Sequence, residues 1–202
     1  LVLRDVGYRY SEADPWVLRH CSLRIAPGES VAIVGPSGCG KTTLLKLMLG
    51  LLPPVEGELS VAGLALGRDG RRPHRDLVAA VMQDDHLFAG SLADNIAFGD
   101  SEPDPARVEA AARLADVHED IAAMPMGYHS LVGDMGSSLS GGQRQRVILA
   151  RALYRQPRFL FLDEIAAYPG DVEGEGDPIA LAEARARTFG WRRKMLLVST
   201  PT

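Results

Sequence analysis

Hydrophobic and polar positions alternate along the first part of the chain. This two-residue period runs through residues 1–10, 16–18 and 22–25 and predicts antiparallel β-strands joined by polar turns. The apolar run 30–34 predicts a buried strand, and a helical pattern begins over residues 43–49. We therefore expect an N-terminal β subdomain followed by a strand, a turn and a helix.

Helical patterns dominate the middle of the chain, over about residues 84–150. Pro105 occupies the first turn of one helix, which continues over 106–115, and residues 144–155 form another. The strand-like segment 77–82 precedes this region. The pattern therefore predicts a helical subdomain inserted between strands.

Two apolar segments in the last quarter of the sequence predict parallel strands. Residues 158–164 form an apolar run that ends in two carboxylates, and residues 194–198 form the second run. Between them, Asp177 can cap a helix over 179–189, and Pro178 suits its first position. A strand, a crossover helix and a parallel strand would complete one sheet.

The composition fits one α/β domain. The chain has 202 residues, of which 46% are hydrophobic and 24% are charged, as is ordinary for a globular protein. The net charge of −4 gives no general attraction to nucleic acid, and no apolar run approaches the roughly 20 residues that a membrane span needs. Two cysteines give no disulfide framework and fit a reducing compartment. Because the sequence begins inside a strand and without Met, we expect it to be a piece of a longer protein.

The segment 35–42 carries the strongest functional signal. Two glycines separated by four residues precede Lys41 and Thr42, and the segment lies between a predicted strand and a predicted helix. Such a loop directs backbone N–H groups and the positive end of a helix at an anion. We therefore expect Lys41 to reach the β- and γ-phosphates of a nucleotide and Thr42 to hold Mg²⁺, rather than a simple glycine-rich turn. The candidate nucleotide-binding residues here are Gly35, Pro36, Ser37, Gly38, Cys39, Gly40, Lys41, Thr42 and Thr43.

Two other segments predict how the nucleotide site is completed. Ser140 is a plausible N-cap, and the two glycines after it leave backbone N–H groups at a helix start, which is a second anion site. Asp163 can hold Mg²⁺ through water, and Glu164 can polarise the attacking water as general base. The alternative for these two acids is a strand that simply runs into a loop.

These motifs together resemble the nucleotide-binding domain of an ATP-binding-cassette (ABC) transporter over residues 1–164. The phosphate loop, Gln83, the signature segment 139–143 and the acid pair at 163–164 occur in the order that this family has. The resemblance implies an α/β P-loop NTPase with a mixed or parallel core sheet, an N-terminal antiparallel β subdomain and a helical signature subdomain. It also implies ATP and Mg²⁺ as ligands, and ATPase activity.

The resemblance further implies a head-to-tail dimer, in which each phosphate loop faces the signature segment of a second nucleotide-binding domain. The signature residues that would then contact the partner's ATP are Ser140, Gly141, Gly142 and Gln143. Gln83 would touch Mg²⁺ or the attacking water and link the site to the membrane domain. Tyr10 would stack on adenine, whereas the residues alone favour packing on its sheet neighbours.

The subtype resembles the exporter class, most closely the bacteriocin and double-glycine peptide exporters. The segments that carry this likeness are residues 81–96, 126–128 and 132–134. It implies a module that powers export of a peptide or similar substrate at the cytoplasmic face of the bacterial inner membrane. The transmembrane domain of the exporter would lie outside this chain.

The resemblance to ABC transporters ends after Glu164. The family continues with a loop that pairs with the partner subunit and later places a His at the γ-phosphate. Residues 165–171 differ from that loop, and no His follows His129. We therefore expect ATP binding to survive and hydrolysis to be impaired.

The tail, residues 165–202, instead resembles the ATPase region of a phage terminase large subunit, a DNA-packaging motor. By that resemblance Ser199 and Thr200 would couple hydrolysis to DNA movement. The basic cluster 191–194 could meet DNA phosphates, although a solvated turn is the favoured interpretation. The chain is thus a composite, by fusion, recombination or assembly artefact. The alternatives to an exporter ATPase are a DNA-packaging fragment, with DNA as partner only if the tail is functional, and a non-catalytic nucleotide-binding fusion.

Overall fold

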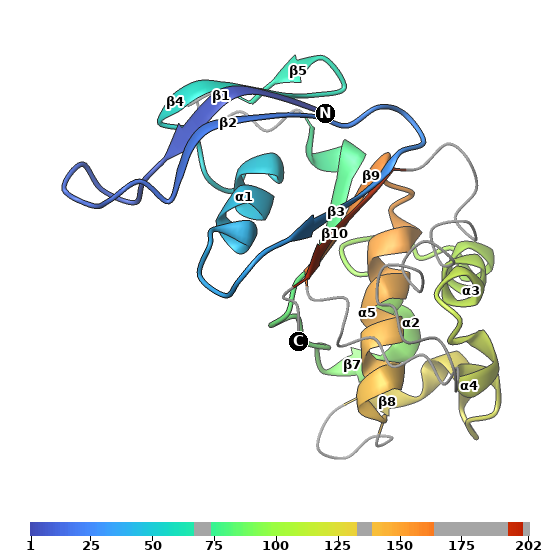
Figure 1. Cartoon of the computed structure of the whole chain (residues 1–202). Coiled ribbons are helices and arrows are strands. Elements are labelled where there is room, and N and C mark those ends of the chain that lie inside the picture. The colour runs from blue at the N-terminus through green and yellow to red at the C-terminus, as the bar shows by residue number, and fades with distance from the viewer. Residues whose placement is uncertain (67–73, 133–138, 164–193, 200–202) are drawn as a thin grey trace, which may run out of the picture. The chain divides into compact units, whose positions relative to one another are not determined.

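The structure, a computed structural model, describes four stretches of the chain, which are residues 1–66, 74–132, 139–163 and, for the backbone alone, 194–199. The chain divides into two compact units. The described residues of the first unit lie within Leu1–Ala80, Arg158–Ile165 and Gly190–Thr202, and those of the second within Val81–Pro157. Figure 1 labels most elements of both units.

An antiparallel sheet begins the first unit, in the order β2-β1-β4-β5. Its strands are β1 (Val2–Tyr8), β2 (Leu18–Arg24), β4 (Glu56–Val61) and β5 (Leu64–Ala65). The buried apolar side chains of β1 and β4 include Leu3, Val6, Leu59 and Val61. The alternating pattern of the sequence predicted this sheet correctly, although its buried residues lie on β1 and β4, and β2 and β5 have none.

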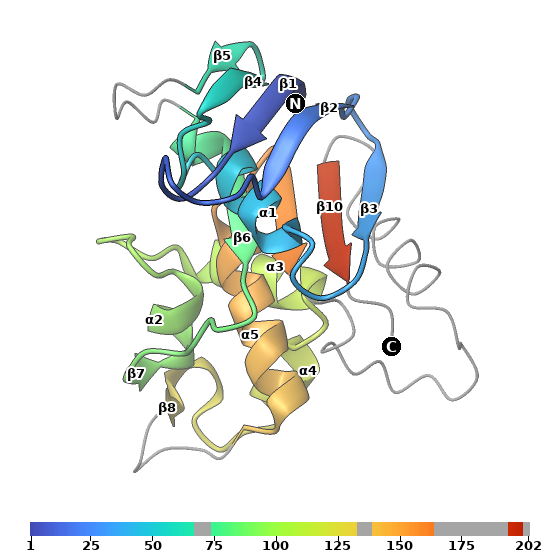
Figure 2. The ribbon, with the colours of Figure 1, turned by 60° about the vertical axis from the view of Figure 1, so that its left-hand side comes forward.

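A second sheet forms the core of the first unit, in the order β3-β10-β9-β6. Its strands are β3 (Ser30–Val34), β6 (Val78–Val81), β9 (Phe159–Asp163) and β10 (Lys194–Ser199). β10 is parallel to both of its neighbours, and Figure 2 shows it beside β3. Leu197 lies opposite Ala32 on β3 and Leu162 on β9. The tail of the sequence thus supplies an internal strand, and the predicted α/β class is confirmed. The helix expected over 179–189 lies outside the described residues.

Among its described residues, the first unit also contains one α-helix and one short helical turn. The α-helix α1 (Lys41–Met48) packs against β9 and β10 and buries Leu44, Leu45, Leu47 and Met48. The 3-10 turn η1 (Arg75–Leu77) leads directly into β6. The carboxyl ends of the parallel strands β3 and β9 therefore lie at the same edge of the sheet, where ligands bind in open α/β sheets.

The second unit is mainly helical. Its helices are α2 (Leu92–Ile96), α3 (Pro105–Leu114), α4 (His118–Ala122), the 3-10 turn η2 (Gly127–His129) and α5 (Gly141–Tyr154). The short strands β7 (Gly90–Ser91) and β8 (Leu131–Val132) pair with each other. α5 packs against α2 and α3 and buries Val147, Ile148, Ala150 and Leu153. None of the helices in the described part of the chain has both the length and the apolar character of a membrane-spanning helix.

Two helix starts show how well local sequence defines the boundaries. Asp104 caps α3, with its side chain accepting a hydrogen bond from the Ala106 N–H at 2.9 Å, so the predicted start at Pro105 is correct. α5 begins at Gly141, directly after the predicted N-cap Ser140, and Ser140 and Gln143 form a reciprocal capping box. The glycines of the signature segment are therefore part of the helix.

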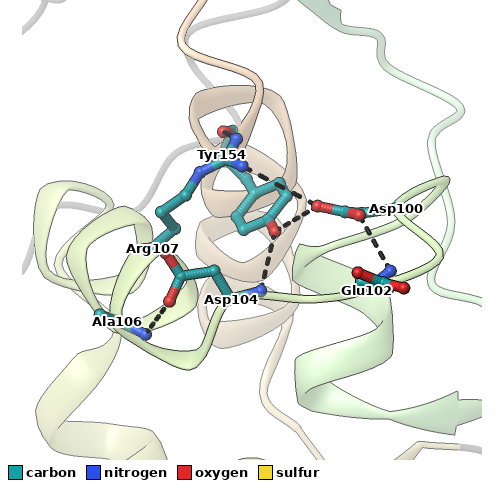
Figure 3. Close-up of polar contacts among 6 residues, drawn as sticks. All are labelled: Asp100, Glu102, Asp104, Ala106, Arg107 and Tyr154. Atoms are coloured by element: carbon teal, nitrogen blue, oxygen red, sulfur yellow. Dashed lines mark hydrogen bonds and ion pairs between the residues drawn. The ribbon is translucent and has the colours of Figure 1, made fainter.

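The C-terminal end of α5 is tied to the start of α3 by a polar cluster (Figure 3). The hydroxyl of Tyr154 donates to Asp100 Oδ2 at 2.7 Å and accepts from the backbone N–H of Asp104 at 3.3 Å. Arg107 donates to the Tyr154 carbonyl at 3.0 Å and lies 4.4 Å from the centre of its ring. The hydrogen bond from Tyr154 lowers the pKa of Asp100, and burial raises the pKa of Tyr154. The cluster holds the last turn of α5 in place.

Candidate functional site

The segment 35–40 joins the end of β3 to the start of α1, as the sequence predicted. Gly38 and Gly40 have φ angles of 79° and 95°, in the left-handed region that favours glycine. A side chain on Gly35 would also place its Cβ 2.8 Å from the sulfur of Cys39. Because the N-cap of α1 is Gly40, no side chain covers the first turn of the helix. The loop is therefore a tight backbone curve that ends at an uncapped helix start.

Lys41 places its ammonium group on this curve. Its Nζ donates to the carbonyl oxygens of Gly35 at 2.7 Å and Pro36 at 2.9 Å, and lies 4.0 Å from Cys39 Sγ. The loop thus combines a positive charge, backbone N–H groups and the positive end of α1. This combination favours a phosphate group.

Thr42 and Asp163 meet where α1 begins and β9 ends. The hydroxyl of Thr42 donates to Asp163 Oδ2 at 3.4 Å, and Asp163 is only 7% exposed. A hydroxyl and a carboxylate are hard oxygen ligands, which Mg²⁺ prefers. This pair of side chains therefore fits a magnesium ion at the predicted place.

Tyr10 lies beside the same helix. Its hydroxyl makes a hydrogen bond with the Thr43 hydroxyl at 3.1 Å. Its ring contacts the Tyr8 ring in an edge-to-face geometry, with centres 5.1 Å apart, yet Tyr10 is 60% exposed. The ring therefore packs on one sheet neighbour and still offers surface for another ring to stack on.

The signature segment lies in the second unit, at the start of α5. Ser140 Oγ accepts from the Gln143 N–H at 3.2 Å, and Gln143 Oε1 accepts from the Ser140 N–H at 3.0 Å. The other end of the Gln143 amide, Nε2, donates to Asp120 Oδ1 at 3.1 Å. Among the described residues, a Cβ on Gly141 would meet no atom within 4 Å, so none of them covers the helix start on that side.

The structure brings only some of the predicted residues together. Tyr10, residues 35–43 and Asp163 belong to the first unit, whereas Gln83 and residues 140–143 belong to the second. Gln83 is exposed in the turn after β6, beside Met82, whose N–H donates to Asp85 Oδ2 at 2.8 Å. Glu164 and Thr200 lie outside the described residues, and Ser199 is described by its backbone alone.

The sequence did not predict the roles of two residues that hold the signature helix. Asp120 contacts Gln143, and Arg151 on α5 joins the helix to the segment after Gln83. Arg151 donates to the backbone and side-chain oxygens of Asn95 at 2.9 and 2.8 Å and to the His86 carbonyl at 3.0 Å. Burial lowers the pKa of Arg151. Only the capping-box pattern of Ser140 and Gln143 was a signal in the sequence, because the other contacts join residues far apart along the chain.

Comparison with protein families gives two matches. The family described as ABC transporter matches residues 18–167. The ATPase domain of the phage terminase large subunit gpA matches residues 149–202. Both predicted resemblances are thus found, and the two matches overlap over residues 149–167, which include β9.

Individual proteins with similar sequences include two bacterial ATP-binding or ATP-dependent proteins. The colicin V secretion/processing ATP-binding protein of Escherichia coli is 45% identical over 164 residues, which are 81% of this chain and 24% of that protein. An ATP-dependent lipid A-core flippase of Alkalilimnicola ehrlichii is 46% identical over 160 residues, which are 79% of this chain and 27% of that protein. The chain spans about a quarter of the length of these relatives.

Among solved structures, a bacterial Atm1-family ABC exporter with ATP bound has the same fold. Its TM-score is 0.82 at 32% sequence identity, and the match covers 99% of this chain and 34% of that one.

Proposed function

Because this chain belongs to the ABC transporter family, we propose that it is the ATP-binding and ATP-hydrolysing domain of an exporter. The observation that carries the proposal is the meeting of Thr42 and Asp163, 3.4 Å apart, next to a loop that holds the Lys41 ammonium. A phosphate cradle and a pair of magnesium ligands at one sheet edge are what a nucleoside triphosphate requires.

Nucleotide binding would use the first unit alone. Lys41 would exchange its contacts with the Gly35 and Pro36 carbonyls for phosphate oxygens. Thr42 and Asp163 would hold Mg²⁺, which neutralises charge on the phosphates when bound. The exposed ring of Tyr10 would stack on adenine. These residues supply affinity and fix the position of the phosphates.

Hydrolysis would need a second copy or a second nucleotide-binding domain. In a head-to-tail dimer, Ser140 and Gly142 of one domain would contact the γ-phosphate held by the loop of the other. Gln83 would orient the attacking water or contact Mg²⁺, and Glu164 would act as general base. A transmembrane domain outside this chain would couple these steps to export of a peptide at the cytoplasmic face of the bacterial inner membrane.

Turnover should be slow, because Ser199 and Thr200 follow the last apolar run where the family places a His that contacts the γ-phosphate. Loss of one such electrostatic contact lowers a rate by about 10²–10³. Release of phosphate from ATP by the purified chain, and by its Glu164→Gln variant, measures this. A Glu164-dependent turnover of about 1–100 s⁻¹, the usual range for phosphoryl-transfer enzymes such as kinases, would show that the tail supplies a substitute contact.

The match of residues 149–202 to the terminase ATPase favours a second candidate function, a fragment of a DNA-packaging motor. That range includes β10, the strand between β3 and β9. Double-stranded DNA should then stimulate ATP hydrolysis and bind in a salt-dependent way. If DNA leaves the ATPase rate unchanged and does not bind, this second candidate is wrong and the exporter function stands.

Nucleotide binding is tested by titrating the chain with radiolabelled ATP and Mg²⁺. Lys41→Ala should weaken binding at least about tenfold, because it removes charge-assisted hydrogen bonds to the phosphates. Lys46→Ala is the matched control, since Lys46 lies in the last turn of the same helix. Equal affinity in the parent and the Lys41→Ala variant would contradict the proposed function.

A further inference from the structure

We propose that Asp120 is a positioning residue for the signature segment and that it acts through the side chain of Gln143. The proposal rests on the function above, in which Ser140 and Gly142 bind the ATP of a second domain. It gives Gln143 a different role from the predicted one. Gln143 would orient the helix start instead of contacting nucleotide.

The contacts around Asp120 use both of its carboxylate oxygens. Oδ1 accepts from Gln143 Nε2 at 3.1 Å, and Oδ2 accepts from Arg146 Nη2 at 2.8 Å. Asp120 lies on α4, while Gln143 and Arg146 lie on the first two turns of α5. One carboxylate therefore anchors two side chains of the signature helix from a neighbouring helix.

The anchoring pair is partly shielded from water. The side chains of Arg146 and Asp120 are 26% and 33% exposed. Burial alone raises the pKa of Asp120, but the hydrogen bonds from Arg146 and Gln143 outweigh it and lower the pKa. Arg146 Nε is buried and has no hydrogen-bond partner among the described residues. Asp120 therefore pairs with the positive charge of Arg146, and this ion pair links α4 to α5.

The amide of Gln143 passes this geometry to Ser140. An amide is planar and has one donor end and one acceptor end. An ionised Asp120 can only accept hydrogen bonds, so the amide end that faces it must be the donor, Nε2. The acceptor end, Oε1, is then directed at the Ser140 N–H, at 3.0 Å. Asp120 thus decides which way the Gln143 side chain faces.

This arrangement leaves hydrogen-bond donors of the signature segment available to an anion. Ser140 Oγ accepts from the Gln143 N–H, so its own hydrogen remains available to donate. Ser140 and Gly141 are exposed, and the space beside Gly141 is open. The signature segment is therefore set in a donor-presenting conformation before any phosphate arrives, and Asp120 maintains it.

The sharpest variants change the hydrogen-bond pattern and keep the shape. Gln143→Glu retains an acceptor for the Ser140 N–H, because a Glu at this position also closes a capping box. It loses the donor to Asp120 and places two carboxylates together. The double variant Asp120→Asn with Gln143→Glu restores a donor–acceptor pair with its direction reversed. Glu119→Ala is the control for charge removal, since Glu119 precedes Asp120 on α4 and its side chain is 88% exposed.

The first measurement is amide hydrogen exchange over residues 139–147, which needs no nucleotide. Gln143→Glu and Asp120→Ala should raise the exchange rate about tenfold, the double variant should return it to within about twofold of the parent, and Glu119→Ala should leave it unchanged. The proposal is wrong if Gln143→Glu exchanges like the parent, or if the double variant is as fast as the single ones.

The second measurement is self-association in ATP and Mg²⁺ by analytical ultracentrifugation, together with ATP affinity at low protein concentration. Gln143→Glu should weaken ATP-dependent association about tenfold and leave the ATP affinity of the single chain unchanged, and the double variant should recover association. Association of Gln143→Glu at the parent's strength would overturn the proposal. If the parent itself does not associate in ATP, the dimer in the proposed function is wrong, and the exchange measurement still decides the role of Asp120.

Discussion

A glycine lies at the start of both α1 and α5, but the two helix starts are built in different ways. α1 has Gly40 as its N-cap, with φ at 95°, and relies on the Lys41 ammonium for positive charge. α5 has Ser140 as its N-cap, and a capping box fixes its first turn. The first start has no side-chain cap and brings its own cation. The capping box fixes the second start, and Asp120 pairs with the charge of Arg146 on the next turn of α5.

In the proposed dimer, this difference would let two anion sites serve one nucleotide. The loop before α1 would hold phosphate without the second site, because it supplies N–H groups and the Lys41 charge and lies beside Thr42 and Asp163. The start of α5 offers neutral donors in a fixed orientation. It is therefore suited to complete a site whose main affinity comes from elsewhere. That division of roles matches a shared site in a dimer.

The largest expected effect comes from separating the two helix starts onto different chains. Lys41→Ala removes the cation of one, and Ser140→Ala removes the cap and hydroxyl of the other. Neither variant alone should form an ATP-dependent dimer. An equimolar mixture should form one, because it contains one intact loop facing one intact signature segment. Size-exclusion chromatography in ATP and Mg²⁺ measures this, and a mixture that stays monomeric contradicts the head-to-tail arrangement.

Replacing Gly40 and Gly141 by alanine should show which helix start needs glycine for its backbone conformation and which needs it only for contact with a ligand. Gly40→Ala should lower the free energy of unfolding by about 1–2 kcal/mol, because a Cβ is strained at this positive φ. It would also lie 3.1 Å from Val17 Cγ1. Gly141→Ala should change stability by less than about 1 kcal/mol, since its Cβ has open space and helix interiors favour Ala. Urea unfolding of both variants gives the comparison.

The two glycine variants should also differ in their effects on ATP binding and on ATP-dependent association. Gly40→Ala should weaken ATP binding by the single chain, whereas Gly141→Ala should leave it intact and impair only ATP-dependent association. If Gly141→Ala destabilises the fold as much as Gly40→Ala, the start of α5 is under backbone strain, and the contrast between the two helices fails.

A smaller effect should follow from the other end of α5. Tyr154→Phe removes a buried hydroxyl that bonds Asp100 and Asp104, and should lower the free energy of unfolding by about 1 kcal/mol. Tyr10→Phe is the matched control in the first unit, since Tyr10 is 60% exposed, and it should cost less than about 0.5 kcal/mol. Urea midpoints of the two variants test whether α5 is the more firmly held helix.

The smallest expected effect is a loss of stability at the two ends of α5 at low pH. The pKa values of Asp120 and Asp100, which anchor the two ends of α5, are lowered in the fold by the bonds from Arg146, Gln143 and Tyr154. Their contribution to stability is therefore complete above the ordinary Asp value of 3.8 and is lost as pH falls through the lower folded values. Hydrogen exchange corrected for intrinsic rates should show the ends of α5 opening at pH 3 but not at pH 5. Equal protection at both pH values would contradict it.

The sequence predicted Ser140 as the N-cap of α5 correctly, but it did not predict the contacts that anchor this helix start as fully as it predicted the loop before α1. Every determinant of the loop before α1 lies within residues 35–42, so a local pattern was enough. The anchor of α5 joins Asp120 to Gln143, which are brought together only by the packing of α4 beside α5. The strand β10 was expected from its apolar run, since buried parallel strands need no alternation.

The position of β10 has a consequence for how this protein is made. β3 and β9 both pair with a strand that the ribosome reaches only at residue 194, more than 150 residues after β3. Until then each of them has an unpaired edge, and such edges are templates for aggregation. Contacts this distant in sequence also slow folding. Translation that stops before β10 would therefore leave a nearly complete nucleotide site on a sheet with a gap in its centre, and chaperones or proteases would meet that species first.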